Sequence, residues 1–368
     1  MRSATDVFAI RLKTRRRFAC WDAILIRMVP QLNCAYVLPI RRTRFNPGDA
    51  VRLRRYLEML KEAGCEVIVA DGSGPEVFDQ YAGILGAVCR HVPVNGRFGY
   101  LNDKVNGIYT GIELASFDRI ILADDDIRYS AANIRAIVRL LDHNDVVRPQ
   151  NFLHPLPWWA KMEAARMLIN RALLPAADYP GTCAFRRGRM LLAGPYDGDV
   201  LFDNEEIIRH LAQDGCTFAY ANDLFVLKCP PTFGKWTEQR PRQAYEDFGM
   251  RLKTTLFFAL LPLSFIIGGR FGIAGLAMFF LTLSVLATLI AGRGRARGQA
   301  RHFFPAHCCL FAALWMFERT LSTYWALYWY LIRGGYPFGG GILSRGIGRA
   351  WWSGGRAAVA QLRLSPKS

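Results

Sequence analysis

The sequence predicts an α/β domain with a mainly parallel sheet, followed by a C-terminal region of transmembrane or interfacial helices. Between residues 34 and 141, short apolar runs alternate with segments of helical periodicity, a pattern typical of a parallel sheet with helices on both faces. From about Arg251 onward, the chain changes to long uncharged runs. The 368 residues are enough for one sizeable domain and such an appendage.

The predicted elements follow from hydrophobic periodicity and from the turn residues that bound it. Leu53, Leu57 and Leu60 recur at helical spacing before Gly64, and a continuous apolar run directly precedes Asp124. The predicted strands are Cys34–Ile40, 66–70, a segment within 84–92 and Arg119–Ala123, and the predicted helices are 49–63, 103–115 and Ala131–Leu141.

Acidic residues follow two of the predicted strands, at the sheet edge where ligands of such folds gather. Asp71 ends one strand, and Asp124, Asp125 and Asp126 follow another. Consecutive carboxylates there suit Mg²⁺ or Mn²⁺ held jointly with a diphosphate, whose charge the metal offsets. A solvated turn or helix start is the alternative for the three acids, although their position at a strand end favours a site, and the sequence equally permits an Asp-Gly turn at Asp71.

Two predicted helix starts carry further candidates. Lys104 opens one helix and can pair with a phosphate, although Asn102 and Asp103 also read as ordinary caps. Asp203 opens the acidic run 203–206, which supplies either a general base for a hydroxyl group or a charge complement to the helix dipole.

A basic segment precedes the apolar region and contains Gln239, Arg240 and Arg242. Arginine binds diphosphates with two parallel hydrogen bonds, so a lid over a diphosphate is one interpretation and a juxtamembrane basic patch is the other. Trp158 and Trp159 lie between the acidic motifs and either stack on a sugar face or pack in the interior.

The apolar region predicts two membrane spans and an interfacial helix. Residues 271–292 are uncharged and exceed the roughly 20 residues that cross a bilayer. The run 254–269 is shorter and contains Pro262, so it either spans a thinned bilayer or re-enters the bilayer without crossing it. Arg270 would then lie at the tip of the hairpin. The run 302–332 is rich in aromatic residues and is interrupted by Glu318 and Arg319. This composition favours a helix at the membrane–water interface. A buried soluble helix is the alternative for the long run.

The distribution of charge favours lipid as a partner over nucleic acid. The formal net charge is +17 and the sequence pI is about 9.8, which suits nucleic acid, anionic lipid or a phosphorylated substrate. Arginines gather beside the apolar runs, and no nucleic-acid reading motif is present. Four of them lie in the loop 293–301, which the positive-inside rule places in the cytoplasm together with the N-terminal domain.

These features predict a multi-pass protein of the inner (plasma) membrane. Nine cysteines without metal-ligand spacing indicate reduced thiols. The predicted parts are a basic extension (1–33), an α/β domain (34–250), a transmembrane hairpin (251–292) and a region with a basic loop, an aromatic-rich helix and a basic tail (293–368). Within the extension, residues 18–29 form either an interfacial helix or an ordinary N-terminal extension.

Taken in order, these motifs resemble the family 2 glycosyltransferases of GT-A fold that carry C-terminal membrane helices. The resemblance covers about residues 34–248, and each motif alone is weak. It rests on Asp71 after a strand, Lys104 at a helix start, the DxD motif Asp124–Asp126, Gly181-Thr182 before Ala184, Asp203, and Gln239 with Arg242 at the first and fourth places of the QxxRW motif.

The resemblance implies a metal-dependent inverting transfer of a sugar from a nucleotide-diphosphate donor to a hydroxyl group. Asp71, Asp124, Asp125, Lys104, Gln239, Arg240 and Arg242 would contact the donor, Asp126 with Asp124 would hold Mg²⁺ or Mn²⁺, and Asp203 would be the catalytic base. Gly181, Thr182, Trp158 and Trp159 would contact the acceptor. UDP is favoured by family habit, and a lipid-linked or cell-envelope glycan acceptor is a hypothesis.

The sequence departs from the family pattern at two places. Gln243 replaces the Trp of QxxRW, which argues against processive synthesis. Phe202 precedes Asp203 where the family has Glu, which leaves Glu205 and Glu206 as rival bases. Two interpretations compete. One is a sugar nucleotidyltransferase, but this sequence lacks the Gly-rich phosphate loop expected of that class. The other is a non-catalytic membrane protein with a degenerate domain.

Overall fold

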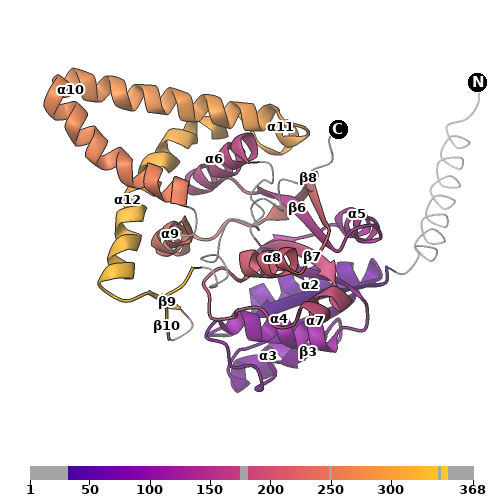
Figure 1. Ribbon diagram of the computed structural model, residues 1–368. Coiled ribbons are helices and arrows are strands. Elements are labelled where there is room, and N and C mark those ends of the chain that lie inside the picture. The colour runs from indigo at the N-terminus through magenta and orange to yellow at the C-terminus, as the bar shows by residue number, and fades with distance from the viewer. Residues whose placement is uncertain (1–31, 175–180, 248–250, 339–340, 347–368) are drawn as a thin grey trace, which may run out of the picture.

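An eight-stranded mixed sheet forms the centre of the N-terminal domain (Figure 1). The computed structural model describes residues 32–174, 181–247, 251–338 and 341–346. The strand order is β3-β2-β1-β4-β7-β6-β8-β5. The strands are β1 (Cys34–Ile40), β2 (Glu66–Asp71), β3 (Arg90–Pro93), β4 (Arg119–Ala123), β5 (Ile127–Arg128), β6 (Val146–Leu153), β7 (Thr182–Arg186) and β8 (Phe218–Lys228).

The predicted α/β class is confirmed, but the sheet is less parallel than predicted. Parallel pairs join β1 with β2 and β4, β2 with β3, and β6 with β8. Strand β7 lies antiparallel between β4 and β6, and β5 is antiparallel to β8. The third predicted strand occupies only the end of its run, because helix α3 (Pro75–Leu85) takes the beginning.

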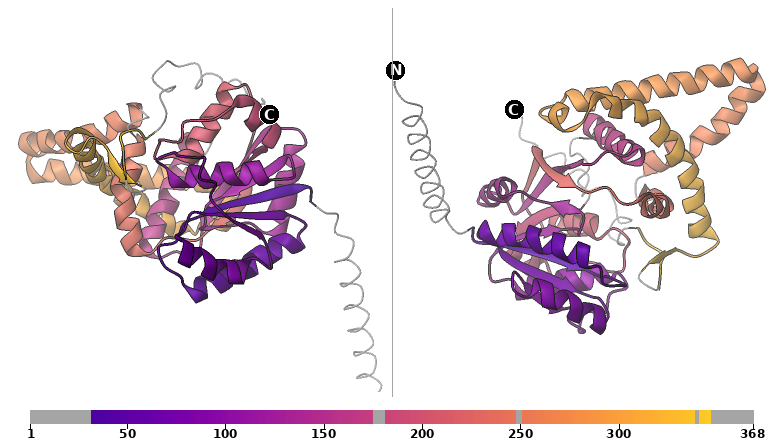
Figure 2. Two further views of the ribbon diagram at one scale, coloured as in Figure 1. Left: turned by 90° about the horizontal axis from the view of Figure 1, so that it is seen from below. Right: turned by 180° about the vertical axis from the view of Figure 1, so that it is seen from behind.

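Helices cover both faces of the sheet, as Figure 2 shows from two further sides. Alternate residues of β1 divide the interior: Tyr36 and Leu38 pack with one group of helices, whereas Ala35 and Val37 pack with the other. The first group is α2 (Pro47–Glu62), α3 and α5 (Ala131–Leu141), and the second is α4 (Asp103–Leu114), α7 (Arg187–Ala193) and α8 (Asp203–Gln213).

The C-terminal region packs onto the domain through α6 (Trp158–Leu173). A second core joins α6 to the last helices through residues such as Leu168, Ala291 and Trp315. These last elements are α9 (Phe233–Asp247), α10 (Arg251–Ala296), α11 (Ala300–Phe303), the 3₁₀ helix η1 (Ala306–Leu310), α12 (Phe311–Leu331) and the hairpin β9 (Tyr336–Phe338) and β10 (Gly341–Leu343).

Helix α10 leaves the body and returns as two legs that meet at a distant tip (Figure 1). The legs join at Gly272, whose φ of 65° interrupts the helix two residues after the expected tip at Arg270. Among the described residues, Lys253–Ala296 is the stretch that is long and apolar enough to cross a membrane, and its most apolar part is 6% buried. One such helix is weak evidence by itself, so the predicted spans stay a prediction.

The two charges that interrupt the aromatic-rich run face the interior rather than an interface. Arg319 is 2% exposed, and its guanidinium donates to the Gln243 side chain of α9 at 3.2 Å. Glu318 lies 3.8 Å from Arg240, which also belongs to α9. The basic extension 1–31, including its segment 18–29, and the basic tail after residue 346 lie outside the described residues.

Helix α4 lies so close to β1 that Gly111 leaves no room for a side chain. A Cβ at this position would overlap Val37. We predict that Gly111→Ala lowers the free energy of unfolding by about 1–3 kcal/mol, the usual cost of overpacking. Alanine is the better helix former, so a stabilised Gly111→Ala protein would contradict this packing.

The matched control is Gly83 of α3, which is exposed and has no atom within 4 Å of an added Cβ. Gly83→Ala is expected to stabilise the protein by up to about 1 kcal/mol. Denaturant midpoints of both variants and the wild type in the same detergent provide the measurement.

Candidate functional site

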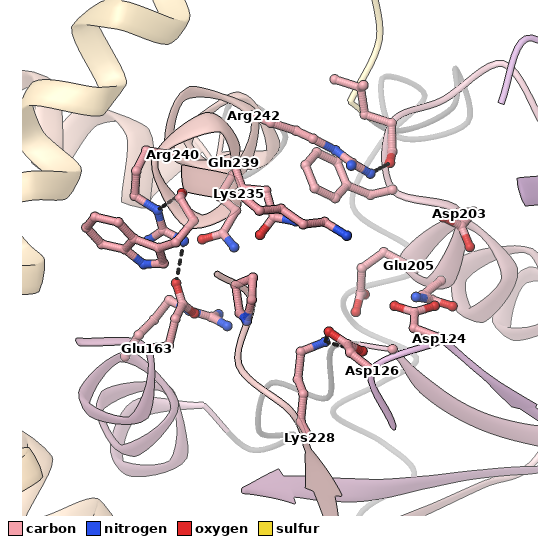
Figure 3. A pocket seen from close by; sticks show the side chains of 18 of the residues that line it. Asp124, Asp126, Glu163, Asp203, Glu205, Lys228, Lys235, Gln239, Arg240 and Arg242 are labelled. Atoms are coloured by element: carbon pink, nitrogen blue, oxygen red, sulfur yellow. Dashed lines mark hydrogen bonds and ion pairs between the residues drawn. The ribbon is translucent and has the colours of Figure 1, made fainter. Parts of the chain in front are cut away.

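A pocket of about 350 Å³ lies between the carboxyl edge of the sheet and the C-terminal helices (Figure 3). Its sheet side carries five carboxylates, and its helix side is formed by α6, α9, α12 and the start of α10. The structure places nine of the sequence-predicted residues on its lining: Lys104, Asp124, Asp125, Asp126, Gly181, Asp203, Gln239, Arg240 and Arg242.

Lys104 joins two of the carboxylates. Its ammonium forms an ion pair with Asp124 and lies 2.7 Å from Oδ2 of Asp203, which is 3% exposed. Helix α4 holds Lys104 there, because the side chain of its cap Asn102 donates to the Val200 carbonyl just before α8 at 2.9 Å. Burial opposes ionisation of Asp124, but Lys104 lowers the pKa of Asp124 to about 2.

Gly181 fits closely against Asp124. It accepts a hydrogen bond from the Asp124 backbone N–H at 3.2 Å, and a Cβ there would lie 2.6 Å from Oδ2 of Asp124. Its φ of 80° is also in the left-handed region that favours glycine. The Gly181-Thr182 motif therefore shapes the carboxylate site through its backbone.

Lys228 neutralises Asp126, and sequence analysis missed it. Its ammonium lies 3.2 Å and 3.1 Å from the two oxygens of Asp126. Burial and the neighbouring Asp124 raise the pKa of Asp126, against the opposing effect of Lys228. The sequence offered one indication of this residue: Lys228 lies at the carboxyl end of a strand, as the acids after β4 do.

The carboxylates fit a divalent cation that a diphosphate would share. Within the described ranges, no group of three His, Cys, Asp or Glu side chains converges as a metal cage. Mg²⁺ is commonly held by one or two carboxylates, with water and substrate phosphates completing its shell. Asp124 and Asp126 offer that pair on the pocket wall, and an ion bound there would compete with Lys104 and Lys228 for their oxygens.

Asp71 does not line this pocket, whereas Asp126 and Asp203 do. One Asp71 oxygen accepts from the Ser73 N–H at 2.8 Å, and the other lies 3.0 Å from Nε2 of His91. Burial raises the pKa of Asp71, but these hydrogen bonds outweigh burial and hold the pKa below its ordinary value. The sequence could not show that both oxygens have partners inside the fold.

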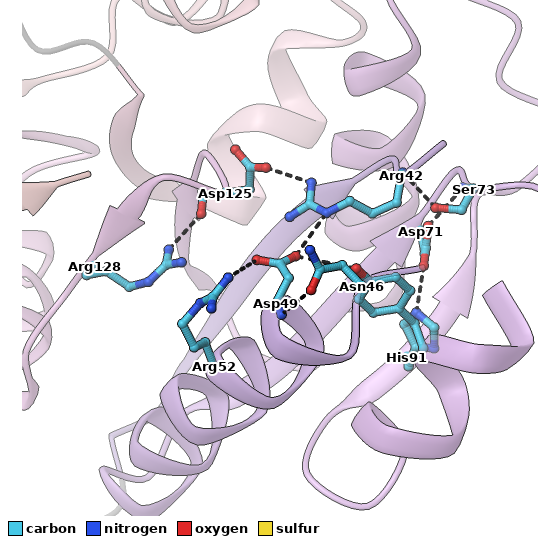
Figure 4. Close-up of polar contacts among 10 residues, drawn as sticks. Arg42, Asn46, Asp49, Arg52, Asp71, Ser73, His91, Asp125 and Arg128 are labelled. Atoms are coloured by element: carbon cyan, nitrogen blue, oxygen red, sulfur yellow. Dashed lines mark hydrogen bonds and ion pairs between the residues drawn. The ribbon is translucent and has the colours of Figure 1, made fainter. Parts of the chain in front are cut away.

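Arg42 connects Asp71 to the pocket. Its backbone N–H donates to Ser73 Oγ at 2.8 Å, and its guanidinium lies 2.7 Å from Asp125, which lines the pocket (Figure 4). Asp49 lies 3.3 Å from the same guanidinium. A donor contact by Asp71 stays a prediction, whereas Arg42 is a residue near the DxD motif that the sequence analysis passed over.

The predicted acceptor residues other than Gly181 lie outside the pocket lining. Thr182 is buried in β7 and bonds the Pro149 carbonyl at 3.3 Å. Trp159 donates to the Pro231 carbonyl at 3.0 Å, and the Trp158 ring lies 5.4 Å from that of Trp236. Both tryptophans thus contact residues that do line the pocket, but Trp158 is 44% exposed, and the expected sugar stacking stays a prediction.

Helix α9 presents Lys235, Gln239 and Arg242 to the pocket from one face (Figure 3), since their spacings of four and three residues return to the same side. Arg242 donates to the Leu201 carbonyl at 2.8 Å, and Phe338 lies 4.3 Å from its guanidinium. Lys235 and Phe338 were not among the predicted residues.

Arg240 lines the pocket too, but its guanidinium is held in the interior. It lies 2.8 Å from Glu163 of α6 and over the Trp236 ring. Burial opposes ionisation of Glu163, yet Arg166 and Arg240 hold the pKa of Glu163 well below its ordinary value. Arg240 therefore forms a supporting ion pair between α9 and α6, and its donor contact stays a prediction.

The acidic run at the start of α8 separates into different environments. Glu206 is buried, forms an ion pair with Arg209 at 2.7 Å and does not line the pocket. Glu205 lines the pocket and lies 2.6 Å from Arg148. Asp203 and Glu205 are thus the two carboxylates of this run that line the pocket.

Comparison with known proteins gives only distant structural likenesses. No family model and no curated protein matches the chain. A mannosyltransferase from Pyrobaculum calidifontis, solved with GDP-Man and Mn²⁺, is 15% identical over 80% of this chain and 87% of its own, with a TM-score of 0.46. Glucosyl-3-phosphoglycerate synthase from Mycobacterium tuberculosis, solved with Mg²⁺ and UDP, is 15% identical over 56% and 78%, with a TM-score of 0.37. This chain is similar to these proteins in fold at low identity.

Proposed function

We propose that this chain is an inverting glycosyltransferase that moves a sugar from a nucleotide-diphosphate donor to a hydroxyl acceptor. The observation that carries the proposal is the single pocket that joins Asp124, Asp126, Lys104 and Asp203 with Arg242 of α9. These charges come from four different elements and meet beside the carboxyl edge of the sheet, where α/β folds bind ligands. The family resemblance of the same motifs supports this function.

The donor diphosphate would lie between the carboxylates and α9. Asp124 and Asp126 would hold Mg²⁺ or Mn²⁺, which offsets charge on the leaving diphosphate. Lys104 and Arg242 supply fixed positive charge, and Gln239 donates from the same face of α9 as Arg242. Fixed charges of this kind stabilise a transition state without reorganising during the reaction. UDP is the nucleotide that we propose.

Asp203 is our proposed base. Lys104 fixes one of its oxygens at 2.7 Å, so the carboxylate has a defined position relative to Asp124 and the donor. It accepts the proton of the acceptor hydroxyl as that oxygen attacks the anomeric carbon, and a positioned base of this kind contributes about 10²–10⁴-fold. The absence of the QxxRW tryptophan supports transfer of one sugar rather than polymer synthesis.

We also propose that the reaction takes place at the inner face of a plasma membrane. The exposed apolar legs of α10 support this, and so do Arg293 and Arg295 in its last turns and Arg297 and Arg301 just after it. Such a basic segment is retained in the cytoplasm by the positive-inside rule, and the domain would share that side if both legs cross the bilayer.

Asp203→Asn is predicted to lower kcat by at least about 10²-fold while UDP affinity stays within a factor of two, because only the proton acceptor is lost. Release of UDP from a donor that supports turnover gives the rate, and calorimetry gives the affinity. Glu205→Gln is the matched variant, with an expected rate within about threefold of wild type. A rate lost in Glu205→Gln and kept in Asp203→Asn would transfer the base to Glu205.

Asp126→Ala is predicted to abolish the Mn²⁺-dependent part of UDP binding, weakening it by at least about 100-fold, since even outer partners of metal sites contribute 10–100-fold. Titration of UDP with Mn²⁺ and with EDTA measures that part directly. Asp142→Ala, which breaks an ion pair with Arg119 outside the pocket, is the control and should bind as wild type. UDP binding that is unaffected by EDTA in the wild type would remove the metal from the proposal.

A further inference from the structure

We propose that Lys228 exchanges partners when the donor binds: its ammonium pairs with Asp126 in the free protein and with the donor diphosphate once a divalent cation is held at Asp126. The inference rests on the proposed glycosyl transfer and adds a donor-binding residue to it. Its consequence is that the metal and the nucleotide each bind weakly alone and tightly together.

Lys228 contacts both oxygens of the carboxylate that is proposed to hold the metal (Figure 3). Its ammonium lies 3.2 Å from Oδ1 and 3.1 Å from Oδ2 of Asp126. Both residues line the pocket, and the Lys228 side chain is 16% exposed. Because an ammonium and a divalent cation on the same carboxylate repel each other, a metal at Asp126 would displace the ammonium.

Lys104 and Lys228 differ in the partners that such a displacement leaves to them. Lys104 pairs with Asp124 and Asp203, so it keeps Asp203 when the metal takes Asp124. For Lys228, the described ranges of the chain show an ion pair with Asp126 alone. An ammonium that is mostly shielded from water and lies beside a second cation is costly unless an anion pairs with it. The metal alone would leave Lys228 in that state.

The backbone keeps Lys228 beside the site whichever partner its side chain has. The N–H of Cys229 donates to the Asp126 carbonyl at 2.7 Å, and Lys228 pairs with Ile127 in the antiparallel ladder of β5 and β8. Lysine carries a compact charge on a flexible four-carbon stem, so the ammonium can turn to a neighbouring anion while the strands stay fixed. The diphosphate that the proposed function places between the carboxylates and α9 is such an anion.

This exchange couples the binding of the two ligands. UDP alone would face the negative charge of the carboxylates, and the metal alone would leave Lys228 without a partner. Bound together, the metal pairs with Asp126 and the diphosphate pairs with Lys228. Each ligand therefore raises the affinity for the other, and thermodynamic linkage requires the same factor in both directions.

Removal of the Lys228 charge is expected to change two affinities in opposite directions. The metal alone should bind more tightly, because Asp126 no longer has to be released from an ion pair. UDP in the presence of the metal should bind more weakly, because the diphosphate loses a cationic partner. A residue with only a structural role would weaken both when it is replaced, so the opposite signs identify the exchange.

The test measures binding to the full chain in neutral detergent, with Lys228→Met as the variant that removes the charge and keeps the length of the side chain. Electron paramagnetic resonance of free Mn²⁺ gives the affinity for Mn²⁺ alone, and calorimetry gives the affinity for UDP with Mn²⁺ or with EDTA. We expect Lys228→Met to bind Mn²⁺ alone at least about threefold more tightly, the scale of a partly exposed ion pair. UDP with Mn²⁺ should bind about tenfold more weakly, because a charge-assisted hydrogen bond is lost.

Two control variants separate this ion pair from the general effect of charge. Lys228→Arg keeps a cation opposite Asp126, so its affinity for Mn²⁺ alone should stay within about twofold of the wild type. Lys235→Gln removes the same charge from an exposed lysine of the pocket lining. Its affinity for Mn²⁺ alone should also stay within about twofold, because solvent and salt screen an exposed charge.

Independent binding of Mn²⁺ and UDP to the wild type would overturn the proposal without any variant. So would a Lys228→Met protein that binds Mn²⁺ alone no more tightly than the wild type, or that binds UDP with Mn²⁺ equally well. Lys235→Gln with the same two effects would assign them to charge in general and overturn it too. A wild-type chain that binds no UDP under either condition would instead contradict the proposed donor, so the two failures are distinguishable.

Discussion

The ion pairs of Lys104 with Asp124 and Asp203 are the constraint on which the site depends. They join the start of α4, the end of β4 and the start of α8 at one point. Without the ammonium, the carboxylates of Asp124 and Asp203 would face and repel each other, which would separate the elements that carry them. The Asn102 contact to Val200 supports the same junction from the backbone. The position of the proposed base is therefore set by the packing of three elements, not by the local conformation of α8.

Local patterns in the sequence were enough to predict the helices and strands, but not which strands pair or which side chains meet. Strands β1 and β4 and helix α5 have their predicted bounds, because hydrophobic periodicity is a local property. The antiparallel insertion of β7 depends on residues far along the chain, and no local pattern encodes it. The acids after β4 were identified from their position, whereas Lys228 and Glu163 gain their role only through folding. Trp158 and Trp159 were left open between sugar stacking and packing, because sequence alone does not reveal which side of α6 faces the pocket.

The C-terminal helices form one side of the pocket, and α10 also projects away from the body of the protein. Arg240 ties α9 to Glu163 of α6 at 2.8 Å, and Arg319 of α12 reaches Gln243 beside them. Past the last helix, the carbonyls of Arg345 and Gly346 accept hydrogen bonds from the N–H groups of Leu201 and Phe202, directly before Asp203. Any shift of the helices relative to the sheet would therefore move both the lining residues of α9 and the segment that carries the proposed base. If α10 enters a bilayer, the lipid surface becomes part of the framework that holds the two sides of the pocket at their working distance.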